Sequence, residues 1–169
     1  MPEAIARIAA FETTLFEALD AAGTAGLDDA AGRDAFRRAM TALDSAVECR
    51  SEQLYTPLAA DPLTRDYVSH LDAQLCDLAA RIDILRAHIE LGLETGCEDE
   101  TVMNASLTRL ASQLKIRFSR ESALIPVYFS WCDRHAAAAA SALLRPANET
   151  GPEVSDFRPG RVPPTRPAL

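Results

Sequence analysis

Apolar residues recur every three or four positions along most of the first 145 residues, which is the period of an amphipathic α-helix. The clearest stretch joins Leu71, Leu75, Leu78, Ile82, Leu85 and Ile89, with spacings of 4, 3, 4, 3 and 4 residues. This spacing is typical of the seam of a left-handed helical bundle. Runs of β-branched residues are few, so the pattern predicts an all-α fold.

Glycine and proline place the limits of the first two helices. The first is expected over about residues 2–22, with a proline in its first turn and Gly23 just past its end. The second is expected over about residues 29–55, and Pro57 is expected to close it because proline cannot donate a backbone hydrogen bond.

Two further helices complete the pattern. The third restarts after Asp61, which serves as a helix cap, and ends at Gly92 or Gly96. The fourth begins near Thr101, is kinked by Pro126 and resumes as far as residue 144. Four long amphipathic helices with short connections predict an up-down-up-down four-helix bundle.

The composition changes beyond this pattern. Residues 146–169 contain six of the ten prolines and almost no large apolar side chains. Such a segment buries too little surface to offset the entropy of ordering it. The sequence therefore predicts a bundle over residues 1–145 and an extended or disordered Pro-rich tail over residues 146–169.

The net charge and the distribution of charged residues restrict the class of binding partner and the cellular location that we expect. The chain carries a formal charge of −8, which argues against nucleic acid and against anionic membrane surfaces, because both require a basic face. The longest nearly apolar run, residues 136–144, is far shorter than the ~20 residues that span a membrane. Charged residues near the start leave no recognisable export signal, so a cytoplasmic location is expected.

No strong signature of enzyme chemistry is present. The four cysteines lack CxxC spacing, and the glycines form neither GxGxxG nor GxxxxGK. Neither GxSxG nor HExxH occurs. We therefore expect a protein that is not an enzyme and that needs no cofactor, with a protein partner or self-association as its mode of action.

The apolar stripe of the fourth helix turns polar after Leu114, where the next positions are Arg117 and Glu121. One interpretation is a polar site inside the bundle, in which buried charges must be paired. The other is a solvated pair one turn apart on the surface. The first interpretation brings together the residues that antiparallel helices place at similar heights, namely Glu12, Glu48, Glu52, His70, Arg117 and Glu121.

Two stretches, residues 43–62 and 110–128, resemble the second and fourth helices of hemerythrin-like (HHE cation-binding) domains. In that family a histidine and a carboxylate precede an apolar pair and a proline. Here the endings are Leu-Tyr-Thr-Pro before residue 58 and Leu-Ile-Pro before residue 127, and the preceding acids are Glu52 and Glu121. The resemblance implies the family's four-helix fold over about residues 5–130.

This chain lacks most of the residues that serve as metal ligands in that family. A di-iron site of this type needs roughly five imidazoles and two bridging carboxylates, whereas the whole chain has 3 histidines. The family's histidine position in the fourth helix falls on Ile116 or Arg117, and an arginine can pair with the carboxylates in place of a cation. The resemblance thus implies a degenerate site that has lost its metal.

Three functions remain open at this stage. The first is a non-enzymatic regulatory or protein-interaction module without a di-iron site. The second is a metal- or oxygen-binding protein with an altered carboxylate-rich site in the bundle. The third is a small-molecule sensor that uses the polar interior as a pocket, with Tyr128 and Trp131 near its mouth.

Overall fold

The computed structural model describes residues 3–96 and 99–143. Within these ranges the chain forms α-helices and one π-helical turn, without any β-strand, so the all-α prediction is confirmed. The chain divides into two units, Met1–Arg134 and His135–Leu169. The predicted Pro-rich tail, residues 146–169, lies outside the described residues.

The first two helices, α1 (Glu3–Ala25) and α2 (Ala30–Arg50), are joined by a tight turn. The prediction that Gly23 ends the first helix is wrong, because Gly26 adopts the left-handed conformation (φ 81°) and α1 continues to Ala25. Asp29 then caps α2, since its side chain accepts a hydrogen bond of 3.1 Å from the backbone N–H of Ala31.

A π-helical turn, η1 (Ser51–Tyr55), links α2 to the short helix α3 (Thr56–Ala60). The prediction that Pro57 closes the second helix is therefore wrong. In a regular α-helix the proline ring would clash with the carbonyl four residues back. Here the N–H of Thr56 donates to the carbonyl of Ser51, five residues back, and the wider turn keeps the chain helical past the proline.

The next two helices are α4 (Arg65–Thr95) and α5 (Glu100–Glu121). Gly96 ends α4 with a φ of 61°, and Asp99 caps α5 by accepting a 2.7 Å hydrogen bond from the N–H of Thr101. The predicted seam of α4 is buried at five positions and half-buried at Leu85; the buried residues are Leu71, Leu75, Leu78, Ile82 and Ile89.

Helix α6 (Leu124–Leu143) follows α5 after a break at residues 122–123. The sequence predicts a single kinked helix here, and the structure has two helices instead. Pro126 has no N–H to donate to the carbonyl of Ser122, four residues back. The N–H of Ile125 donates to that carbonyl instead, at 3.1 Å.

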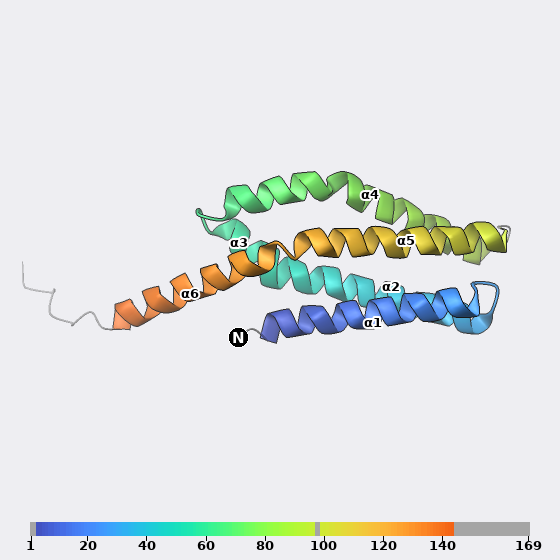
Figure 1. Ribbon diagram of the computed structural model, residues 1–169, viewed down its shortest axis with the longest axis horizontal. Helices are drawn as coiled ribbons and strands as arrows, with labels where there is room; N and C mark the ends of the chain where they lie inside the picture. Colours follow the sequence, from blue (N-terminus) through green and yellow to red (C-terminus); the bar gives the residue numbers. More distant parts are fainter. Residues whose placement is uncertain (1–2, 97–98, 144–169) are drawn as a thin grey trace, which may run out of the picture. The chain divides into compact units, whose positions relative to one another are not determined.

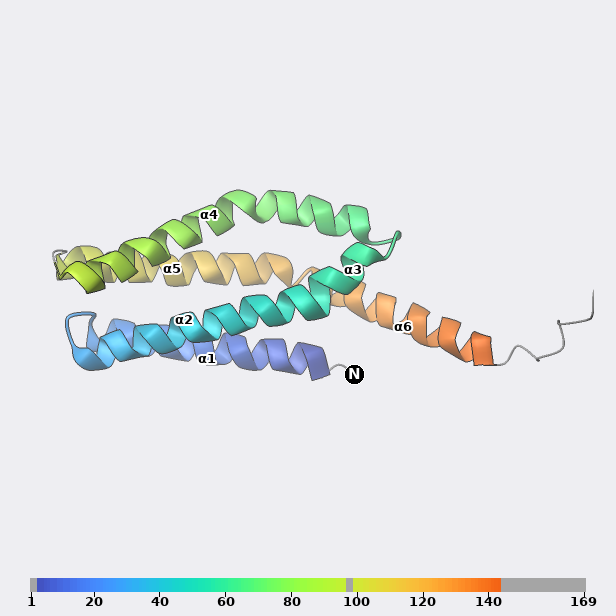
Figure 2. The same ribbon diagram turned by 180° about the vertical axis from the view of Figure 1, so that it is seen from behind.

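Helices α1, α2, α4 and α5 run alongside one another, as both views of the ribbon show (Figures 1 and 2). The closest backbone approaches lie within two helical hairpins, α1 with α2 and α4 with α5. The α1–α2 turn and the ends of the α4–α5 connection meet at one end, which we call the loop end (Figure 1). Residues from α1, α2, α4 and α5 share one large apolar core.

A smaller apolar cluster of Ile8, Cys49 and Leu54 lies beside η1, away from the loop end. None of the described helices combines the length and apolar character that a membrane span requires.

A buried ion-pair chain as the candidate functional site

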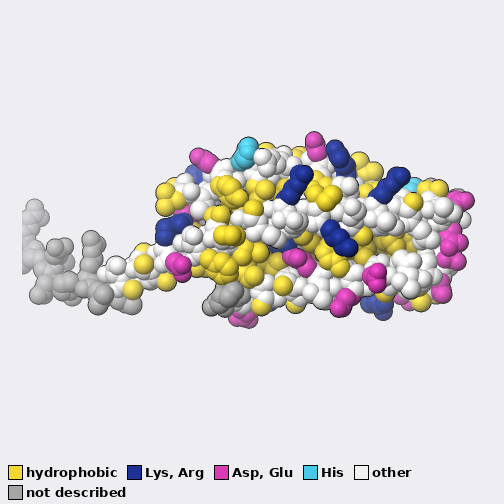
Figure 3. Space-filling model, in the orientation of Figure 1, with side chains coloured by type: hydrophobic (Ala, Val, Ile, Leu, Met, Phe, Trp, Pro, Cys, Tyr) yellow, Lys and Arg dark blue, Asp and Glu magenta, His cyan; other side chains and the backbone are white. Residues whose placement is uncertain are grey.

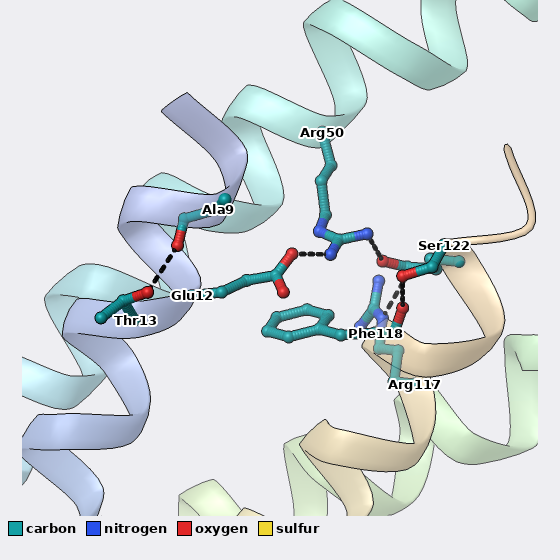
Figure 4. Close-up of polar contacts among 8 residues, drawn as sticks. Ala9, Glu12, Thr13, Arg50, Arg117, Phe118 and Ser122 are labelled. Carbon is teal, nitrogen blue, oxygen red and sulfur yellow. Dashed lines mark hydrogen bonds and ion pairs between the residues drawn. The ribbon is translucent and has the colours of Figure 1, made fainter. Parts of the chain in front are cut away.

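Arg50, the last residue of α2, is the centre of the polar interior. Its side chain is only 3% exposed, and it reaches from α2 toward both α1 and the end of α5 (Figure 4). One terminal nitrogen, Nη1, donates to Oε2 of Glu121 at 2.8 Å, and the other, Nη2, donates to Oε1 of Glu12. The guanidinium therefore ties three helices together.

Glu121 is the most deeply buried acid of the site, with a side chain 2% exposed. Its two carboxylate oxygens face two different cations. Arg50 donates to Oε2, and the Nε of Arg117, one turn earlier on α5, donates to Oε1 at 2.9 Å. The result is an alternating chain, Glu12–Arg50–Glu121–Arg117, which we call the ion-pair chain.

The ion-pair chain is neutral overall, because it contains two carboxylates and two guanidinium groups. Charges in a low-dielectric interior are costly unless each has a partner, and this alternation supplies one on both sides of Arg50 and of Glu121. The two outer members are partly solvated, since the side chains of Glu12 and Arg117 are 27% and 22% exposed. The ion-pair chain thus has a buried middle, formed by Arg50 and Glu121, and a partly solvated member at each end.

Aromatic rings complete the surroundings of Arg50. The guanidinium carbon of Arg50 lies 4.4 Å from the centre of the Phe118 ring, a cation–π distance (Figure 4). Phe118 in turn meets Phe16 edge-to-face at 6.1 Å, which fixes the ring from the α1 side. Phe118 precedes Glu121 by three residues, so one face of α5 provides both the carboxylate and the aromatic partner.

Tyr55, at the end of η1, borders the same carboxylate. Burial raises the pKa of its phenol well above the ordinary value of 10.0, and the negative charge of Glu121 and hydrogen bonding to that carboxylate raise it further. The phenol is therefore protonated at all ordinary pH values and acts as a donor toward Glu121.

A cavity of about 420 Å³ adjoins the ion-pair chain. It lies between α2, η1 and α3 on one side and α4 on the other, and α5 contributes two residues to it. Three of its wall residues are apolar and the others are polar or charged. The lining consists of Val47, Arg50, Ser51, Tyr55, Thr56, Ala59, Val68, Ser69, Asp72, Arg117 and Glu121.

A second hollow follows the line between α1 and α5, where hydrophobic side chains remain visible on the surface (Figure 3). Its apolar wall includes Phe16, Leu19 and Leu107. Lys115 stands at this hollow with its ammonium group 5.6 Å from the Phe16 ring centre. This hollow has no buried charge, so the first cavity is the chemically richer of the two.

The structure brings together three of the six residues that the sequence assigned to the polar core: Glu12, Arg117 and Glu121. It does not place the other three there. Glu48 and Glu52 are exposed because the buried face of α2 and η1 passes through Cys49, Arg50 and Leu54 instead. His70 is also exposed, and its ring nitrogen Nε2 lies 2.9 Å from the side-chain amide of Gln74 on the same helix.

Arg50 is the residue that the sequence reasoning missed, although the stripe of the second helix reaches Arg50 or Ser51 after Val47. A charged residue at a position that the apolar pattern assigns to the core was the available signal. Its acidic partners lie 38 and 71 residues away in sequence, so local spacing could not reveal them.

Comparisons of this chain with family models, with curated proteins and with solved structures give no match.

Proposed function

We propose that this chain is a non-enzymatic, hemerythrin-like helical bundle without a functional di-iron site, and that it acts as a regulatory binding module. The observation that carries the proposal is the ion-pair chain itself. Where the family resemblance implies metal ligands, both oxygens of the buried Glu121 accept hydrogen bonds from guanidinium groups.

The position of the two resembling stretches supports this proposal. Residues 43–62 carry Arg50, and residues 110–128 carry Arg117 and Glu121, so the same two stretches supply most of the ion-pair chain. Both stretches also contain a proline that coincides with a helix irregularity, the π-helical turn before Pro57 and the break before Pro126. In this proposal α1, α2, α4 and α5 correspond to the four helices of an up-down-up-down bundle.

Electrostatics supports the replacement of a metal by arginine. A cation bound to Glu121 would lie beside two permanent positive charges, on Arg50 and Arg117, which would oppose its binding. The alternative of a metal- or oxygen-binding protein with an altered carboxylate-rich site has less support. The described residues contain no grouping of three or more His, Cys, Asp or Glu side chains that could hold an ion.

Metal content tests this proposal directly. The full chain is purified without chelators or an affinity tag, and iron, manganese and zinc are measured by plasma mass spectrometry together with an absorption spectrum. Less than about a tenth of an equivalent of each metal is expected, because a carboxylate already paired with guanidinium groups is a poor ligand. One or two equivalents of any of them would overturn the proposal.

The regulatory part of the proposal implies a partner, either another protein or a second copy of this chain. Sedimentation velocity over a wide range of protein concentrations measures self-association. A concentration-dependent shift to a dimer would identify the second copy as that partner, and a constant monomer would leave a different molecule as the partner.

A further inference from the structure

The cavity beside the ion-pair chain contains more hydrogen-bond donors than its own walls satisfy. Arg117 uses its Nε on Glu121, and its two terminal nitrogens form no hydrogen bond with any residue that the structure describes. The Nε of Arg50 is buried and likewise has no acceptor among the described residues. Both arginines line the cavity. The Arg117 side chain is 22% exposed, so its terminal nitrogens are the donors that a molecule in the cavity can reach and pair with.

The acceptors already present do not meet this need. Both oxygens of Glu121 are engaged by Arg50 and Arg117. Asp72 also lines the cavity, but it forms no salt bridge with Arg117 or with any other described residue. The planar outer edge of the Arg117 guanidinium is therefore open, and it has the geometry that pairs with a carboxylate through two parallel hydrogen bonds.

The size and the apolar wall of the cavity restrict the rest of the molecule. A volume of about 420 Å³ lies within the range of ligand pockets. Val47, Ala59 and Val68 offer a short aliphatic surface. This surface favours an anion with an aliphatic chain over an inorganic anion such as phosphate, which has no apolar part to bury.

We propose that this cavity binds a small aliphatic carboxylate, whose carboxylate group pairs with the outer edge of Arg117 and whose chain packs against Val47, Ala59 and Val68. This inference rests on the proposed function and specifies it, because it makes the bundle a sensor of a small organic acid. Binding would add a second carboxylate to Arg117, next to Glu121, and would thereby couple the ligand to the ion pairs that join α1, α2 and α5.

Isothermal titration calorimetry of the full chain with 3-methylbutanoate tests the proposal, with inorganic phosphate as the comparison anion. Saturable binding of 3-methylbutanoate to one site is expected, with phosphate at least about tenfold weaker. Absence of saturable binding would overturn the proposal. Equal binding of the two anions would overturn it as well, because the apolar wall would then contribute nothing.

Two variants locate the site without removing a buried charge. Ser69→Phe fills the cavity from an exposed position on α4, and it is expected to abolish binding. Its matched control is Ala73→Phe, one turn further along the same helix at an exposed position outside the cavity lining, which should bind as the natural chain does. Unchanged binding in Ser69→Phe, or equal loss in both variants, would contradict the assignment.

Arg117→Lys tests the role of the guanidinium. Lysine keeps the positive charge beside Glu121 but loses the planar pair of donors, so binding should weaken by about tenfold or more. Circular dichroism and the thermal midpoint verify that the variant is folded, and unchanged affinity in a folded Arg117→Lys protein would overturn the proposal.

Metal analysis of the natural chain used for calorimetry separates the carboxylate-binding inference from the proposed function. Metal-free protein that binds no carboxylate refutes only this inference, whereas stoichiometric metal refutes the proposed function.

Discussion

The two ends of the helical bundle are stabilised by different means. At the loop end the helices are regular, two glycines with positive φ follow the ends of α1 and α4, and aspartates cap α2 and α5. At the opposite end, which we call the polar end, α2 passes into a π-helical turn, α5 breaks before Pro126, and the ion-pair chain joins α1, α2 and α5.

This difference separates local from long-range determinants of the fold. Each feature of the loop end is specified by residues within a few positions of one another, such as Asp29 and the N–H of Ala31. At the polar end Arg50 depends on Glu12 and Glu121, which belong to other helices. The polar end therefore forms only when α1, α2 and α5 are assembled, and it is the end where the cavity and the open edge of Arg117 lie.

Removal of the central acid should produce the largest effect. Glu121→Ala leaves Arg50 buried with one partner fewer and removes the ion-pair partner of Arg117, so we expect a loss of about 3–5 kcal/mol in the free energy of unfolding. Urea denaturation followed by circular dichroism measures it. The control is Asp34→Ala, which removes the exposed pair with Arg37 and should cost about 0–1 kcal/mol. Similar losses in the two variants would mean that burial of the ion-pair chain has no special energetic role.

A smaller effect is expected at the loop end, where the backbone is closely packed. A Cβ atom on Gly32 would overlap the carbonyl oxygen of Gly26, a backbone atom that cannot rotate away. Gly32→Ala should therefore cost about 1–3 kcal/mol in the free energy of unfolding, as measured by urea denaturation.

Gly23 provides the matched control for this substitution. It lies inside α1, and a Cβ atom there would only touch the side chain of Leu107 at 3.9 Å. Gly23→Ala should increase stability by about 0.5–1 kcal/mol, because alanine favours the helix more than glycine does. A pair of changes with the same sign would contradict the account of a backbone clash at Gly32.

The sequence predicted the locally determined features of the helices better than it predicted the polar end. The seam of α4 from Leu71 to Ile89 was predicted from its spacing, because burial of a helix stripe depends on a local period. The choice between Gly23 and Gly26 as the end of α1 was wrong by three residues, since both are glycines and only the turn geometry distinguishes them.

The polar end could be predicted only in part. The apolar stripe that turns polar at Arg117 and Glu121 indicated two members of the ion-pair chain, and these are neighbours on one helix. Glu48 was assigned to it wrongly because it lies on the exposed face of α2, beside the buried Cys49 and Arg50, and Glu52 because the prediction treated residues 29–55 as one regular helix. The π-helical turn at residues 51–55 depends on how Pro57 is accommodated, and a fixed helical period cannot represent it.

The last prediction concerns Tyr55 and tests the polar end through the pH dependence of the free energy of unfolding. Because burial and Glu121 raise the pKa of the Tyr55 phenol in the folded chain, the folded state retains this proton at pH values where the unfolded chain loses it. The contribution of the phenol to stability is thus complete below the ordinary pKa of 10.0 and declines as the pH rises above it.

Tyr55→Phe has no such proton. The free energy of unfolding of the natural chain, relative to that of this variant, should therefore fall steadily between about pH 10 and 12. Urea denaturation of both proteins across this range measures the difference. A constant difference between the natural chain and Tyr55→Phe would show that the phenol titrates alike in both states, and the link between Tyr55 and Glu121 would have to be abandoned.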